Sequence, residues 1–253
     1  MTIDWSKFHV PTPMEVAEKY IKERNREVVS LDDCLLINNI SCIDADGNVF
    51  EQYDKLYVKK DVEKDENNNI KLFTSYNASV HHEQQGGFSP SVALTCSILV
   101  RLYQNRSDPE IKLVLDQYKN LGNGFGYHAQ GTIVDYGSEK IIHYPSAADF
   151  GQTGTVNSSR NRAELSFSKE TLQDILLKDA LKDPAHTRYV KQLTGLPDPT
   201  ILVEIGKYYG RPAKLWFPWN GQAGATFTGK RAAWFGCVSG DLYLYGNYDL
   251  VSD

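Results

Sequence analysis

Three residues in the middle of the chain have types that could perform nucleophilic chemistry: Cys96, His128 and His143. A cysteine thiolate attacks a carbonyl carbon when an imidazole takes or shares its proton, and that imidazole needs a third polar group to fix its orientation. We therefore predict Cys96 as the nucleophile, His128 as the base and His143 as the orienting residue. Such a trio would hydrolyse an amide or ester, or transfer its acyl group.

The two histidines are expected on one face of a β-hairpin whose strands are joined by Gly137-Ser138. A glycine in the first position of a two-residue turn is typical of type II′. In that register Thr132 faces His143, and His128 and Gln130 lie on the same face because alternate residues of a strand share a side. The sequence thus predicts a polar face that carries both histidines.

Cys96 lies in the segment 89–106, SPSVALTCSILVRLYQNR, which begins with Ser/Pro start signals and continues as a largely apolar helix. If the first half of this helix packs on the polar face of the hairpin, Cys96 meets His128 and the helix dipole favours the thiolate. Gln130 and Thr132 would then lie beside the substrate, and we predict them as substrate-binding residues.

The same residues resemble a known family. The run 95–103, TCSILVRLY, resembles the D-C-S-G-L-V-x-Y helix of NlpC/P60-type papain-like cysteine peptidases, and the run 128–143 resembles the hairpin H-V-G-I-Y-x-G-x-G-x-x-I-H of that family. The resemblance covers residues 91–146. By position it implies Cys96 as the nucleophile, His128 as the base and His143 as the orienting residue. It also implies cleavage of amide bonds in cell-wall or related small peptides.

A second interpretation of Cys96 stays open. Cysteine is among the most buried residue types, and VALTCSILV also suits a core helix in which the thiol only fills space. The two histidines would then be ordinary hydrogen-bonded residues of the hairpin.

Two other function classes are compatible with the sequence. The C-terminal region contains Trp216 and Trp219 within LWFPWNGQ, and aromatic faces with flanking amides suit sugar rings, bases or peptides. A non-enzymatic binding protein that uses these tryptophans is therefore one alternative. A structural or assembly protein is the other, and the sequence leaves the oligomeric state open.

Composition excludes several classes. The chain has 253 residues, a formal net charge of −5 and four cysteines without a C-x-x-C pair. We expect a cytoplasmic protein, because no signal peptide is visible, and no membrane span, because no apolar run reaches about 18 residues. The absence of a Lys/Arg stripe argues against nucleic acid as a partner. A small peptide or small-molecule ligand is the expected partner, and no cofactor is expected.

No metal site is predicted either. His82-Glu83 is followed by Gly86 where the two-histidine zinc motif needs a second histidine, so His81 and His82 are interpreted as exposed loop residues.

The expected fold is a single α+β domain over residues 1–253, with sub-parts 1–85 and 86–253, a mainly antiparallel sheet packed against a central helix, and a β-rich C-terminus. Periodicity and turn signals predict strands over 35–41, 48–59 and 69–76, the hairpin above, and helices over 11–28 and 108–121, with further helices after Ser168, Asp183 and Asp198.

Overall fold

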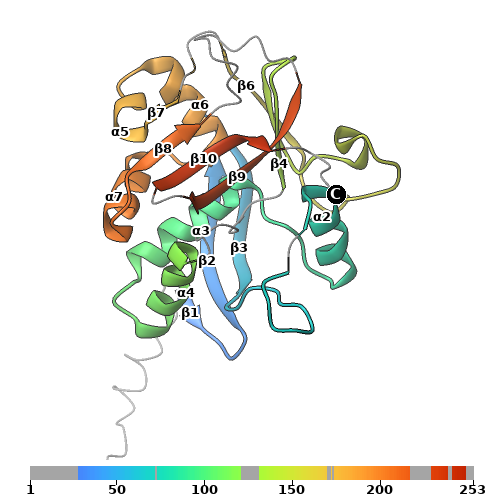
Figure 1. The fold of residues 1–253 in the computed structure, drawn as a ribbon, viewed down its shortest axis with the longest axis vertical. Helices are drawn as coiled ribbons and strands as arrows, with labels where there is room; N and C mark the ends of the chain where they lie inside the picture. The colour runs from blue at the N-terminus through green and yellow to red at the C-terminus, as the bar shows by residue number, and fades with distance from the viewer. Residues whose placement is uncertain are drawn as a thin grey trace, which may run out of the picture.

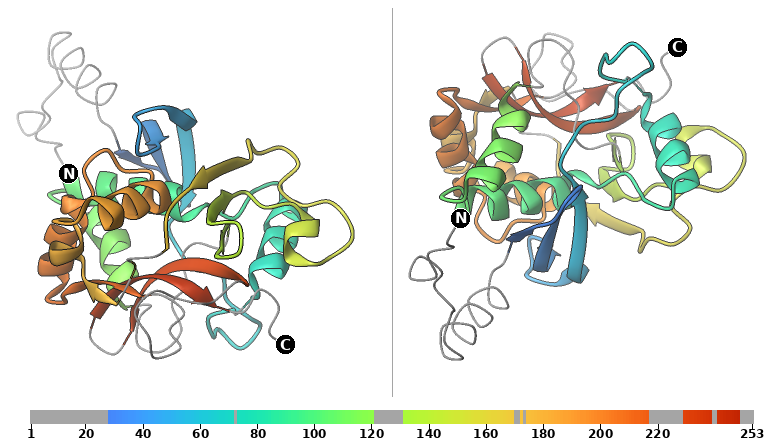
Figure 2. Two further views of the ribbon diagram at one scale, coloured as in Figure 1. Left: turned by 90° about the horizontal axis from the view of Figure 1, so that it is seen from above. Right: turned by 90° about the horizontal axis from the view of Figure 1, so that it is seen from below.

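The computed structural model describes residues 28–71, 73–120, 131–169, 172, 174–216, 229–238 and 241–248 (Figure 1). These residues form an α+β domain in which helices lie between two β-sheets (Figure 2). The predicted fold class, with its mainly antiparallel sheet, central helix and β-rich C-terminus, is confirmed. The helix expected over 11–28 lies outside the described residues, except that Val28 begins the first strand.

The smaller sheet is an antiparallel meander of β1 (Val28–Ser30), β2 (Cys34–Ile43) and β3 (Val49–Lys59). The turn between β2 and β3 forms because the Asp44 carboxylate accepts the backbone N–H groups of Asp46, at 2.9 Å, and Asn48, at 2.8 Å. Buried and exposed side chains alternate along much of both strands, so one face of this hairpin packs against the helices.

The larger sheet has the strand order β6-β5-β4-β9-β10-β8-β7. Neighbouring strands are antiparallel, apart from the parallel pair β8 and β10. Its strands are β4 (Thr132–Asp135), β5 (Lys140–His143), β6 (Ala163–Ser166), β7 (Ile175–Leu176), β8 (Ala213–Trp216), β9 (Lys230–Val238) and β10 (Asp241–Tyr248).

The central helix is α3 (Val92–Gln104), which contacts β2 of the smaller sheet and β9 of the larger one. It begins at Ser91, whose hydroxyl oxygen accepts the backbone N–H of Leu94 at 3.0 Å. Every residue from Val92 to Leu99 is buried, because both sheets and neighbouring helices cover this part of the helix. α3 therefore forms the middle of the main hydrophobic core.

Helices α4 (Pro109–Asn120), α6 (Pro184–Thr194) and α7 (Thr200–Tyr209) begin where Asp-Pro pairs predict them. The carboxylates of Asp108, Asp183 and Asp198 each accept a backbone N–H from the first turn. The shorter elements are η2 (Ala147–Phe150) and α5 (Leu177–Ala180). The helix expected directly after Ser168 is instead strand β7 followed by α5.

Helix α2 (Ser75–Gln84) occupies a segment for which the sequence predicted a strand and then a loop. The Thr74 hydroxyl accepts the Asn77 backbone N–H at 3.2 Å and starts the helix. Tyr76 and Val80, four residues apart on one face, pack on a small core cluster that includes Phe150. Few apolar residues are involved, so the helical period is weak in the sequence, and the strand prediction over 69–76 is wrong.

Candidate functional site

Cys96 lies in the hydrophobic core and not at a surface. Its side chain is 0% exposed, and burial raises the pKa of the thiol well above its ordinary value. A catalytic cysteine needs the opposite environment, with solvent access and a lowered pKa. In this structure Cys96 therefore fills space in α3, which is the second of the two interpretations that the sequence left open.

His143 is buried too, and both of its ring nitrogens have partners inside the protein. Nε2 lies 2.9 Å from the Gln192 carbonyl oxygen, which can only accept, so Nε2 carries the hydrogen. Nδ1 then accepts the hydroxyl hydrogen of Thr132 at 3.0 Å, and the Thr132 oxygen accepts the backbone N–H of Val92 at 2.9 Å. Burial lowers the pKa of His143 to about 4, so the ring is neutral at pH 7.

This network corrects the roles predicted for two residues. Neither nitrogen of His143 is left to orient another imidazole, and Thr132 is 0% exposed with its hydroxyl engaged on both sides, so it contacts no substrate in this conformation. Instead, the two side chains tie β4 and β5 to the start of α3 and to α6.

The predicted register of the hairpin is confirmed, because Thr132 pairs with His143. The predicted type II′ turn is wrong. Glu139, at φ 55°, has the positive φ, whereas Gly137 does not. The Asp135 carboxylate instead accepts the backbone N–H groups of Gly137, at 2.9 Å, and Ser138, at 3.1 Å, which fixes a longer turn.

The remaining predicted site residues stay predictions. His128, Gln130 and Trp219 lie outside the described residues, and Trp216 belongs to β8 but its side chain is not described.

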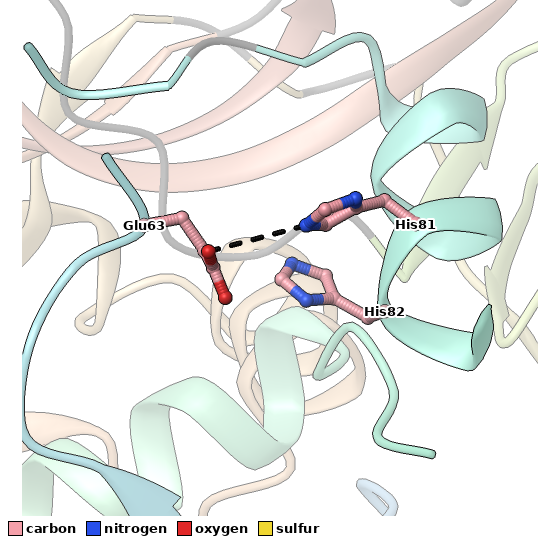
Figure 3. A group of neighbouring side chains, drawn as sticks. All are labelled: Glu63, His81 and His82. Carbon is pink, nitrogen blue, oxygen red and sulfur yellow. Dashed lines mark ion pairs between the residues drawn. The ribbon is translucent and has the colours of Figure 1, made fainter. Parts of the chain in front are cut away.

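A different group of side chains has the composition of a metal site. It consists of Glu63, His81 and His82. Each of these residues offers one ligand atom, and among the described residues these three atoms all lie within 4.8 Å of one another. Figure 3 shows the two imidazoles extending from α2 toward the carboxylate, which comes from the segment after β3. Two elements that are separate in the sequence therefore supply the ligands.

The backbone around Glu63 is fixed by a small loop. Lys71 donates its backbone N–H to the Glu63 carbonyl at 2.9 Å, and Lys64 forms an isolated β-bridge with Ile70. The Asp65 carboxylate closes the loop by accepting the Asn69 backbone N–H at 2.8 Å. These contacts hold the base of the loop and leave the Glu63 side chain directed at α2.

The two histidines occupy the last turn of α2. The carbonyl end of a helix carries partial negative charge, which favours a cation at this position. Phe73 packs against the ring of His81, with ring centroids 4.7 Å apart, and also contacts His82 at 6.0 Å. Burial, with a smaller contribution from His81, lowers the pKa of His82, so this imidazole is neutral at pH 7, the form that binds metal ions.

The separation of the ligand atoms is slightly larger than a bound ion requires. His81 Nε2 lies 4.0 Å from Glu63 Oε2, whereas two ligands of a tetrahedral zinc ion are about 3.3 Å apart for bonds of about 2.0–2.2 Å. Small side-chain rotations that shorten this distance by about 0.7 Å would bring the two ligand atoms to that separation. The backbone arrangement already suits the site.

Two neighbouring polar side chains contact the ligands. Lys59, the last residue of β3, donates to Glu63 Oε1 at 2.6 Å, and this hydrogen bond lowers the pKa of the Glu63 carboxyl. The Gln85 side-chain amide lies 3.0 Å from His81 Nε2. Glu63 and His81 therefore both have partners within the chain.

A second titratable cluster surrounds Glu51, which is 5% exposed. Its carboxylate accepts hydroxyl groups from Tyr144, from Tyr53 at 2.9 Å and from Ser91 at 3.3 Å. Burial raises the pKa of the Glu51 carboxyl despite these donors. Since the donors come from the protein itself and include the residue at the start of α3, this cluster joins the smaller sheet to the core.

The chain was compared with known proteins in three ways, and no family model, curated protein or solved structure matches it. Within the described ranges, no helix combines the length and apolar composition needed to cross a membrane.

The sequence interpretation missed the metal-type group because it treated His81 and His82 as exposed loop residues. The structure corrects this: both belong to α2 and are half-buried. The adjacent histidines were the available signal. Nothing in the spacing pointed to Glu63, because it approaches them only through the path of the loop.

Proposed function

We propose that this protein binds a divalent transition-metal ion, with zinc as the best fit, through the Glu63 carboxylate and the imidazoles of His81 and His82. The observation that carries the proposal is the convergence of these three ligand atoms within 4.8 Å from two separate segments. The neutral form of His82 and the carbonyl end of α2 support it.

The ligand types favour particular ions. Imidazole and carboxylate ligands suit zinc and the neighbouring ions cobalt, nickel and copper, whereas calcium and magnesium prefer sites made of oxygen. Three protein ligands leave a fourth position of a tetrahedral ion for water or for a donor atom of a ligand. The site would therefore hold a zinc ion with one exchangeable position.

A bound ion would join the segment around Glu63 to the last turn of α2. Because the ligands come together only in the folded chain, binding would stabilise the fold by about 2.7 kcal/mol when the free ion is at 100 times its dissociation constant. The metal would thus act first as a clamp on this side of the molecule.

The test is a titration of the purified, metal-stripped protein with zinc, by competition with a chromophoric chelator, at pH 7. We expect one ion per chain, and at least about tenfold weaker binding for Glu63→Gln and for His82→Gln. Glu66→Gln is the matched control, since Glu66 is an exposed carboxylate of the same loop and should bind as the unaltered protein does. Equal binding by all four proteins would refute the proposal.

Cobalt gives a second readout that depends on geometry. A cobalt ion held by two imidazoles and a carboxylate in a tetrahedral arrangement should show strong visible absorption, and His82→Gln should abolish it. A pale spectrum typical of the hydrated ion, at concentrations that saturate the protein, would contradict the proposed site.

A further inference from the structure

We infer that Lys59 is a built-in competitor of the metal ion, so that binding exchanges one cation at Glu63 for another. This inference rests on the proposed function and concerns the regulation of the same site. It follows from the ion pair that the Lys59 ammonium makes with the Glu63 carboxylate at 2.6 Å.

The position of the ammonium puts it in competition with a metal ion for the Glu63 carboxylate. It occupies Oε1 of the carboxylate whose other oxygen, Oε2, faces His81 at 4.0 Å. A divalent ion bound between Glu63 and the histidines would lie within a few ångströms of this ammonium, where like charges repel. The two cations therefore compete for the negative charge of one carboxylate, and the ammonium weakens the hold of Glu63 on the metal.

Lys59 is free to leave. Its side chain is 64% exposed, so the ammonium loses little when it moves into water. A second acceptor is nearby, since the Gln85 side-chain oxygen lies 3.5 Å from the ammonium. The exchange requires a rotation of one long side chain and no movement of β3.

The competition would set the minimum affinity for carboxylate and imidazole that an ion needs in order to bind. Ions that bind carboxylate and imidazole strongly displace the ammonium, whereas weakly bound ions such as magnesium do not. In the metal-free protein Glu63 already faces the two histidines, so the ligand atoms lie close together before an ion arrives. Lys59 would thereby weaken binding and select among ions.

The experiment compares zinc binding by the unaltered protein, Lys59→Met and Lys60→Met at low ionic strength. Lys60 is the matched control because it removes the same charge, yet its ammonium pairs with Glu110 at 3.8 Å and not with Glu63. We expect Lys59→Met to bind zinc about fivefold more tightly, the effect of losing one exposed ion pair, and Lys60→Met to stay within twofold.

The outcomes separate the two proposals. Unchanged or weaker binding by Lys59→Met, with binding by the unaltered protein intact, overturns the competition and leaves the metal site standing. A failure of all three proteins to bind zinc refutes the metal site itself. Binding by Lys59→Met alone supports the competition and shows that the ammonium blocks the site in the natural chain.

Discussion

The neutral state of His143 predicts a measurable acid sensitivity of the fold. The ring accepts a hydrogen bond at Nδ1 from Thr132 and donates one from Nε2 to the Gln192 carbonyl. Protonation would place an N–H against the hydroxyl hydrogen of Thr132 and a charge in the core. The folded state therefore resists protonation of this ring.

The size of the effect follows from the two pKa values. The ordinary value is 6.5 and the value in the folded protein is about 4, a difference of about 2.5 units at 1.36 kcal/mol each. Between these pH values the unfolded chain holds a proton that the folded chain does not, so the free energy of unfolding decreases as the pH falls. His143 alone should lower it by about 3 kcal/mol between pH 7 and pH 4.

Urea unfolding of the unaltered protein and of His143→Gln at several pH values between 7 and 4 measures this contribution. The raised pKa of Glu51 acts in the opposite direction, but it is common to both proteins and cancels in the difference. The variant is expected to be less stable at pH 7, by about 1–3 kcal/mol for a buried group left unpaired, and the gap should close toward pH 4.

Parallel pH profiles for the two proteins would refute this reasoning. Should the variant fail to fold, nitrogen NMR of the unaltered protein gives the same answer. It should show the hydrogen on Nε2 of His143 at pH 7 and a titration near pH 4, and a titration near pH 6.5 would contradict the buried network.

Two further predictions concern packing. Gly195→Ala should destabilise the fold by about 2–4 kcal/mol, because a Cβ there would lie 2.8 Å from the Cβ of Cys42. Gly210→Ala is the control, since Gly210 also has a positive φ but open space around it, so this variant should lose much less stability in thermal unfolding. Equal losses of stability would exclude the packing effect. Thiol reagents should modify the half-buried Cys34 of the native protein well before the buried Cys42 and Cys96, as peptide mass spectrometry would show, and early labelling of Cys96 would contradict its place in the core.

Local patterns in the sequence predicted much of the fold. Alternation along β2 and β3, the Asp-Pro starts of α4 and α6, and the Thr132–His143 register all depend on residues that are close in sequence, and the structure confirms them. The strand predicted over 69–76 failed because the helix that occurs there is held by packing on η2 and on the β4–β5 hairpin, which lie far along the chain.

The chemistry of the site was less predictable, because it depends on what surrounds each side chain. Cys96 is inaccessible since two sheets cover α3 from different directions, and no pattern within the helix reveals the second cover. Glu63 meets His81 only because a small loop returns toward α2. Types and spacing identified the residues that could react, but not the neighbours that determine whether they do.

The position of α3 between two sheets has a consequence for how the chain folds. The strand β2 of the first sheet precedes α3 in the sequence. The strand β9 of the second sheet, which pairs with β4 through Ile133 and Ala232, is synthesised long after α3. Contacts between such distant segments form slowly, and apolar surface left open in the meantime promotes aggregation. We expect chains that stop before β9 to leave α3 half-covered and to depend on chaperones until β9 is present.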